Sequence, residues 1–214
     1  MAKSGTAKEP LQCCTIRSNG KVVKVGDSVL MRAQDPDEPP YVAQVEKFER
    51  GARNNVKVRV RWYYRPEDSK AGRRQFHGAK ELFLSDHYDT QSVNTIEDTC
   101  VVHSFKNYSN LESVASEDYF CRFEYTPITG YFNPDRVPVY CTCEMPYNPD
   151  DLMVQCEACK EWFHPECIGI SIAEAKEMKD FLCSACKDKY KNNPGTSVND
   201  SVPPKKPKTK RRKR

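Results

Sequence analysis

The cysteine-rich stretch CTCEMPYNPDDLMVQCEACKEWFHPECIGISIAEAKEMKDFLCSAC occupies residues 141–186. Its cysteines and one histidine follow the spacing C-x-C-x12-C-x2-C-x4-H-x2-C-x15-C-x2-C. Zinc takes four sulfur or imidazole ligands in a tetrahedron, and closely spaced pairs supply two corners each. Eight ligands therefore predict two structural Zn²⁺ sites with no position left open for water. The predicted ligands are Cys141, Cys143, Cys156, Cys159, His164, Cys167, Cys183 and Cys186.

The order of these ligands resembles a PHD finger, because the histidine is the fifth ligand and Trp162 lies two residues before it. A RING finger, the nearest alternative, usually has its histidine fourth. The resemblance implies a cross-braced arrangement in which the ligand pairs alternate between the two ions. The first site is then Cys141, Cys143, His164 and Cys167, and the second is Cys156, Cys159, Cys183 and Cys186.

Aromatic and methionine side chains surround these ligands at four positions where methyl-lysine-reading PHD fingers form a cage. A ring face attracts a quaternary ammonium, which cannot hydrogen-bond. Trp162 alone would be explained by packing, but the full set favours a reader of histone H3 di- or trimethylated at lysine 4. The implied cage is Tyr140, Tyr147, Met153 and Trp162. The implied peptide contacts are Asp150, Asp151, Leu152, Val154 and Glu157.

N-terminal to the finger, short runs between residues 28 and 139 alternate apolar with polar side chains, which predicts half-buried strands. The clearest run, NVKVRVRWYY at 55–64, places its valines, Trp62 and Tyr64 on one face and its basic residues on the other. Several short strands with little helical periodicity predict a compact all-β, barrel-like domain.

The blocks WYYRPE at 62–67 and ELFLSDHYD at 81–89 resemble those of BAH domains. A BAH domain followed directly by a PHD finger resembles the plant histone readers of the early bolting in short days and short life type. In that family the BAH domain binds trimethylated lysine 27 of histone H3. The resemblance places the aromatic cage on Tyr41, Trp62 and Tyr64, and peptide contacts on His87 and Asp89. The alternative is that the rings of Trp62 and Tyr64 belong to the core, since they share a face with the valines.

The predicted fold is mainly β, with a BAH-type barrel-like domain followed by a small cross-braced double-zinc PHD finger. One helix is predicted near the C-terminus, because Ser171 and Glu174 have the spacing of a capping box. The predicted organisation is a disordered tail at 1–20, the BAH domain at 21–138, the finger at 139–188 and a disordered basic tail at 189–214.

Composition narrows the class of protein further. Hydrophobic residues make up 38% of the chain, and no run reaches the roughly 18 apolar residues of a membrane span. Eleven cysteines without an export signal favour metal over disulfides, so we expect a soluble intracellular protein. The net charge of +4 comes from the last ten residues, KKPKTKRRKR; without them 26 basic residues face 30 acidic ones. A chain that is mildly acidic outside its last ten residues is not typical of a protein that binds along the phosphate backbone of nucleic acid.

These features predict a nuclear reader of methylated histone H3 tails that regulates transcription, for example of flowering or developmental genes, and has no enzyme activity. We expect transcriptional corepressor complexes and nucleosomal DNA as further partners, and neither a membrane nor a small-molecule substrate. Arg73, Arg74 and Lys80 are candidate DNA contacts, or simply a solvated loop. The alternatives are a RING-like ubiquitin ligase and a DNA-binding protein that uses the basic tail, although that tail reads more simply as a nuclear import signal.

Overall fold

The computed structural model describes residues 11–51, 55–192 and 208–211, and the chain divides into two compact units. The first unit contains the chain up to Pro134 except for residues 75–79. The second unit contains 75–79 and the chain from Asp135 onward. Across the described residues, no helix is both long and apolar enough to span a membrane.

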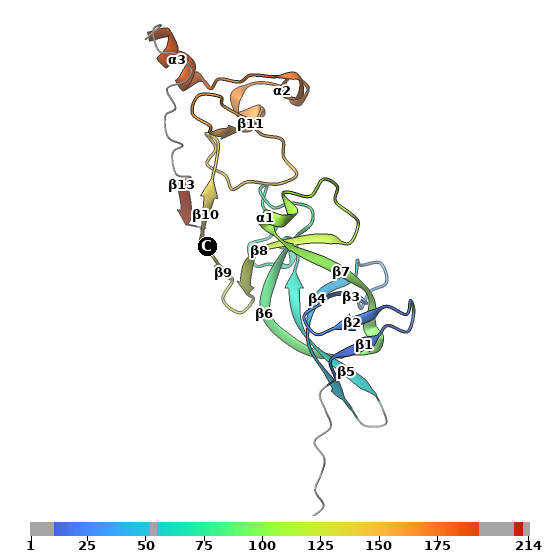
Figure 1. Cartoon of the computed structure of the whole chain (residues 1–214). Coiled ribbons are helices and arrows are strands. Elements are labelled where there is room, and N and C mark those ends of the chain that lie inside the picture. The colour runs from blue at the N-terminus through green and yellow to red at the C-terminus, as the bar shows by residue number, and fades with distance from the viewer. Residues whose placement is uncertain (1–10, 52–54, 193–207, 212–214) are drawn as a thin grey trace, which may run out of the picture. The chain divides into compact units, whose positions relative to one another are not determined.

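Seven strands of the first unit form one sheet in the order β6-β5-β4-β3-β7-β8-β9 (Figure 1). A parallel pairing between β6 and β8 joins the sheet to itself, which closes the strands from β3 to β8 into a barrel. This closure confirms the predicted mainly β, barrel-like class. The seven strands are β3 (Ser28–Met31), β4 (Tyr41–Arg50), β5 (Val56–Tyr64), β6 (Glu81–Ser92), β7 (Ile96–Ser104), β8 (Asp118–Thr126) and β9 (Tyr131–Asn133).

Short helical turns connect these strands. The turn η2 (Pro66–Asp68) follows β5, η3 (Val93–Thr95) follows β6, and helix α1 (Phe105–Tyr108) follows β7. The side chain of Ser104 caps α1 by accepting the backbone N–H of Asn107. With so little helix, the unit depends on its sheet for a core.

Alternation along the strands fills the barrel interior, as the sequence predicts. Val29 and Met31 of β3, and Val58 and Val60 of β5, are almost completely buried. Burying a side chain of this size stabilises the fold by about 1.5–3 kcal/mol. The core cluster that contains them is Ile16, Val23, Val29, Met31, Ala43, Val45, Phe48, Val58, Val60 and Ile96.

An additional hairpin precedes the barrel strands. Strand β1 (Cys13–Thr15) pairs antiparallel with β2 (Val22–Lys24), and the side chains of Ile16 and Val23 enter the core. This ordered strand lies inside the stretch 1–20 that the sequence predicted to be a disordered tail. Its three residues are too few to show an alternation, and only their packing on the core reveals them. Residues 1–10 lie outside the described residues.

The second unit is built from short elements around the cysteine-rich stretch. Its strands are β10 (Arg136–Val139), β11 (Val154–Gln155), β12 (Trp162–Phe163) and β13 (Lys208–Arg211), and its helical segments are η4 (Glu166–Ile168), α2 (Ile172–Glu177) and α3 (Ser184–Asn192). Strand β11 pairs with β12, and β10 pairs with β13. Helix α2 starts with the predicted capping box: Ser171 Oγ accepts the N–H of Glu174, whose carboxylate accepts the N–H of Ser171.

Two of these elements lie in the stretch 189–214, for which the sequence predicted a disordered basic tail. Helix α3 continues to Asn192, and β13 aligns Lys208 with Val139 and Arg211 with Arg136. Backbone pairing of this kind does not require a hydrophobic pattern, so the sequence carries no signal for it. The remainder of that stretch, 193–207 and 212–214, lies outside the described residues.

Candidate functional site

Two clusters of four side chains bring together the eight predicted zinc ligands. Cys141, Cys143, His164 and Cys167 form one cluster, and Cys156, Cys159, Cys183 and Cys186 form the other. Within each cluster the ligand atoms all lie within 4.8 Å of one another. The Sγ atoms of Cys159 and Cys183 are 3.8 Å apart. Zn–S bonds of about 2.3 Å at tetrahedral angles give an S···S separation of about 3.8 Å, so each cluster could hold a zinc ion.

The protein also favours the thiolate form at one cysteine of each cluster. Burial alone raises the pKa of Cys141, but hydrogen bonds from the backbone N–H groups of Cys143 and His164 outweigh it and lower the pKa to about 6. At Cys156 the same competition between burial and backbone N–H groups lowers the pKa to about 7. Thiolate is the form that binds zinc, so the protein favours the zinc-binding form at these two positions, whereas burial and neighbouring thiols raise the pKa of Cys143, Cys159, Cys167 and Cys186.

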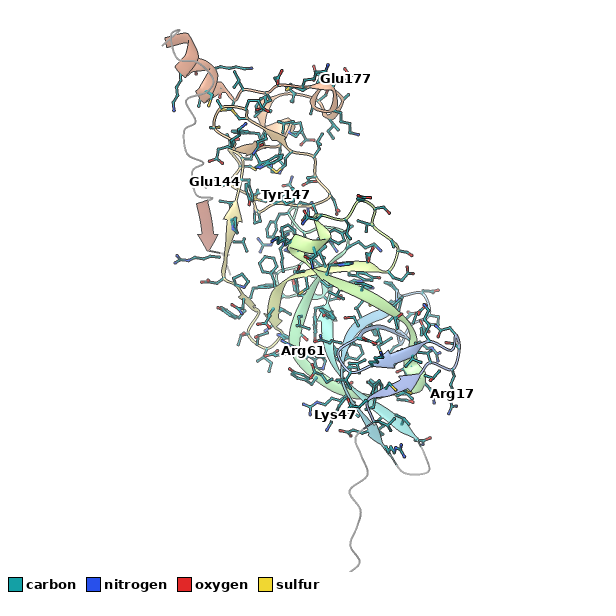
Figure 2. The ribbon with its side chains drawn as sticks, in the orientation of Figure 1. Arg17, Lys47, Arg61, Glu144, Tyr147 and Glu177 are labelled. Atoms are coloured by element: carbon teal, nitrogen blue, oxygen red, sulfur yellow. The ribbon has the colours of Figure 1, made fainter. Side chains whose placement is uncertain are left out.

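A pocket beside these clusters is lined by all four predicted cage residues of the finger. Tyr140, Tyr147, Met153 and Trp162 border a cavity of about 620 Å³ in the second unit. The rings of Tyr140 and Tyr147 meet edge to face, with centroids 6.5 Å apart. Trp162 is 41% exposed, so its ring is available to a ligand and does not merely pack. Figure 2 labels Tyr147 among the side chains of the second unit.

Carboxylates supply negative charge to the same pocket. Asp150 and Asp151 line it together with Leu152. Burial, and then the charges of Asp150 and Asp151, raise the pKa of Tyr147, which places both carboxylates close to that ring. One oxygen of Asp150 accepts the N–H of Ala79 at 2.6 Å, so part of its capacity is used within the unit. The pocket can therefore attract a cation as well as enclose it.

The other two predicted peptide contacts lie outside the lining of the cavity. Val154 belongs to β11, where it pairs with Phe163 of β12. The carboxylate of Glu157 forms an ion pair with Lys160 at 3.0 Å. Both positions remain predictions for contacts along an extended peptide.

The first unit contains a second aromatic pocket, of about 660 Å³, lined by all five residues predicted for the BAH domain. Tyr41 and Trp62 meet edge to face with centroids 6.1 Å apart. Tyr64 lies beside His87, and its hydroxyl is 3.0 Å from His87 Nδ1. The carboxylate of Asp89 accepts the side-chain N–H of Gln91 at 2.6 Å, which fixes its direction.

The rings of Trp62 and Tyr64 lie near an irregularity in the pairing of β5 with β6. Along β5, Val58 and Val60 are fully buried, whereas Trp62 and Tyr64 keep part of their surface exposed. The register between β5 and β6 shifts between Arg61 and Tyr63, and the extra residues of this irregularity lie in β6, between Leu84 and Tyr88. The hydroxyl of Ser85, within this irregular stretch of β6, donates to the carbonyl oxygen of Trp62 at 2.7 Å. The two rings thus line the pocket and also border the core.

Two further carboxylates line the pocket, Glu38 and Asp68, and neither was predicted from the sequence. Glu38 accepts the hydroxyl of Tyr41 at 3.1 Å, and this hydrogen bond raises the pKa of Tyr41. Burial, and then the charges of Tyr125, Asp68 and Asp86, raise the pKa of Tyr64. Both new acids lie within four residues of a predicted cage ring in sequence, in PDEPPY and YRPED. Their closeness to a predicted cage ring in the sequence is therefore the signal that could have identified these two carboxylates.

Comparison with known proteins identifies the two units. Residues 21–136 match the BAH domain, and residues 137–192 match the UBR7-like PHD finger. The chain is 64% identical over 185 residues to "Chromatin remodeling protein EBS" of Arabidopsis thaliana, covering 86% of this chain and 79% of that protein. It is 57% identical over 193 residues to "Chromatin remodeling protein SHL" of the same plant, covering 90% and 85%. The chain belongs to the plant BAH–PHD family of chromatin readers.

Membership of the BAH–PHD family settles the class of function. The protein is a chromatin-associated reader and not an enzyme. The match to a PHD finger agrees with the fifth-place histidine, on which the choice against a RING finger depended. Among solved structures, the yeast Rsc2 BAH domain is 24% identical with a TM-score of 0.48, covering 58% of this chain and 54% of that chain.

Proposed function

We propose that this BAH–PHD protein reads two methylated lysines of histone H3, one in each unit. The pocket of the first unit takes trimethylated lysine 27, and the pocket of the finger takes di- or trimethylated lysine 4. The protein then acts in the nucleus to regulate transcription, for example of flowering or developmental genes, with corepressor complexes as partners.

The observation that carries this proposal is that each unit has an open pocket combining aromatic rings with carboxylates. A trimethylammonium group has a full charge and no N–H, so neither hydrogen bonds nor a purely apolar cavity satisfies it. Ring faces attract it by about 0.5–2 kcal/mol each, and nearby carboxylates add long-range attraction. In the first unit the rings are Tyr41, Trp62 and Tyr64, with Glu38 and Asp68 beside them.

The assignment of one mark to each pocket is tested by removing one indole at a time. We expect Trp62→Ala to weaken binding of the lysine 27-trimethylated peptide at least tenfold and to leave the lysine 4-trimethylated peptide unaffected. Trp162→Ala is expected to do the reverse. Affinities for unmodified peptides should change little, since the rings act on the methylated ammonium. Calorimetric titration of the full chain with each peptide measures these effects.

Tyr131→Ala is the matched control, because Tyr131 is 47% exposed in β9 and lines neither pocket. This variant should bind both peptides like the unmodified protein. If either tryptophan variant lost both marks while retaining its thermal stability, the assignment of one mark to each pocket would be wrong.

A further inference from the structure

A row of cations lies on the outer face of the barrel, on strands β4 and β5. The alternation that buries Val58 and Val60 turns Lys57, Arg59 and Arg61 outward. Successive outward side chains on a strand are about 6.8 Å apart, so the three cover about 14 Å. The register places Lys47 of β4 directly opposite Arg59 and extends the row sideways. In Figure 2, Lys47 and Arg61 lie on the same side of these strands.

These cations are only partly neutralised by the protein. Lys47 pairs with Glu49 at 2.6 Å, and Arg61 pairs with Glu124 at 3.4 Å. In the part of the chain that the structure describes, Lys57 and Arg59 form no ion pair with a carboxylate. Four cations against two carboxylates leave the face with a charge of +2.

The pairing of Lys47 with Arg59 places like charges opposite each other across two strands. Such a pair disfavours the folded protein, and Glu49, which pairs with Lys47 and lies near Arg59 and Lys57, offsets the repulsion only in part, so a further anion would relieve it. In the basic loop that the sequence suggested for DNA contacts, by contrast, two of the cations already have partners within the protein. There, Arg73 pairs with Glu67, and the ammonium of Lys80 donates to the carbonyl oxygen of Ser116.

Tyr88 organises the arginines of this face. It pairs with Arg61 across β5 and β6 and is 42% exposed. The guanidinium carbons of Arg59 and Arg61 lie 5.2 and 5.8 Å from the centroid of its ring. Arg61 is also held by the carbonyl oxygen of Ser85, which accepts its Nε–H. Holding the guanidiniums in place before binding reduces the entropy that is lost when they bind a ligand.

We propose that this face, formed by Lys47, Lys57, Arg59, Arg61 and Tyr88, binds the phosphate backbone of double-stranded DNA. Guanidinium groups match the geometry of phosphate oxygens, and each DNA strand offers a negative charge about every 3.4 Å along the helix axis. Contacts to phosphates carry no sequence information, so binding is independent of base sequence. Single-stranded nucleic acid fits less well, because it needs exposed rings for stacking and the ring of Tyr88 is flanked by arginines.

The test measures binding of a fluorescent duplex of mixed sequence, about 24 base pairs long, to the full chain, by anisotropy at several salt concentrations. We expect Lys57→Glu/Arg59→Glu to weaken binding at least tenfold at low salt. The slope of log K against log salt should become shallower by roughly 2, because each phosphate that a cation neutralises contributes about 0.9 to it. Because both residues are exposed, we expect the double substitution to leave the fold intact, and an unchanged melting temperature verifies this.

The matched control is Lys24→Glu/Lys106→Glu, which makes the same change in net charge at two other exposed positions of the first unit. We expect it to weaken binding less than threefold and to preserve the slope. Both double variants retain the basic C-terminal run, so its contribution cancels between them. Equal reductions of affinity in the two variants would overturn the proposal. So would tighter binding of a single-stranded RNA or an acidic polypeptide than of the duplex. The proposal does not depend on the histone marks, because the probe contains no protein.

Discussion

At the scale of single residues, the barrel contains a buried ion pair where β6 meets β8. The side chain of Glu81 is completely buried, and that of Arg122 is 10% exposed. Two parallel hydrogen bonds of 2.7 and 3.0 Å join the carboxylate to the guanidinium. The guanidinium also lies over the rings of Phe105 and Phe123, at 4.6 and 5.3 Å from their centroids. The pair is thus enclosed by rings at the point where the sheet closes.

Removing the charge of Glu81 is expected to destabilise the barrel strongly. In Glu81→Gln the guanidinium of Arg122 stays buried without its counter-ion, which costs about 3–5 kcal/mol. The control is Glu124→Gln, since Glu124 is 53% exposed in its pair with Arg61 and such surface pairs contribute at most about 1 kcal/mol. Urea unfolding followed by tryptophan fluorescence compares the two. Similar midpoints would show that the buried pair does not hold the closure.

At the scale of elements, helix α2 depends on its first turn. It has only six residues, too few to be stable as an isolated helix. The reciprocal hydrogen bonds between Ser171 and Glu174 satisfy backbone N–H groups that no helix can satisfy internally. Ala175 anchors the helix by burial, while Ile172 is 52% exposed. The cap therefore supplies much of the local stability.

We predict that Ser171→Ala destabilises this helix by about 1 kcal/mol, whereas Ser171→Thr retains the cap. Hydrogen bonds from the N–H and hydroxyl of Ser171 lower the pKa of Glu174 below its ordinary value of 4.5. A lowered folded-state pKa means that this contribution is present above about pH 4.5 and is lost as the pH falls through the folded value. Amide hydrogen exchange over residues 173–177 measures both effects. Uniform exchange in all variants would exclude a role for the cap.

At the scale of the whole molecule, the two units differ in what stabilises them. The first unit has an extensive hydrophobic core inside a closed barrel. The second unit has a small core that includes three of its own zinc ligands, Cys156, Cys183 and Cys186. Its strands β11 and β12 have only two residues each. Metal binding must therefore provide most of the folding free energy of the finger.

Chelation is accordingly expected to unfold the finger alone. The native chain should contain two Zn²⁺, and their removal should abolish binding of the lysine 4 peptide while the lysine 27 peptide and the melting transition of the barrel remain. Native mass spectrometry gives the stoichiometry, and calorimetry gives the transitions. A single bound ion, or loss of both peptide affinities together, would contradict the separate stabilisation of the two units.

Local patterns in the sequence were enough to predict much of this protein. The spacing of the cysteines and His164 predicted the eight zinc ligands, because ligand pairs two or three residues apart already supply neighbouring corners of a tetrahedron. The resemblance to PHD fingers supplied the cross-braced grouping that the two clusters show. Alternation predicted which side of β5 enters the core, and the Ser171 and Glu174 spacing predicted the start of α2. Each of these features depends on residues close together along the chain.

Only the tertiary structure decided the remainder, because it depends on pairings between segments far apart in sequence. The parallel pairing that closes the barrel joins Glu81 to Phe120, and no periodicity within either strand encodes that register. The same closure creates the buried pair with Arg122. Likewise, Glu38 and Asp68 each lie near a cage ring in the sequence, but they share one pocket only because β4 and β5 are neighbours. Sequence specifies the face on which a side chain lies, and strand order decides what it meets there.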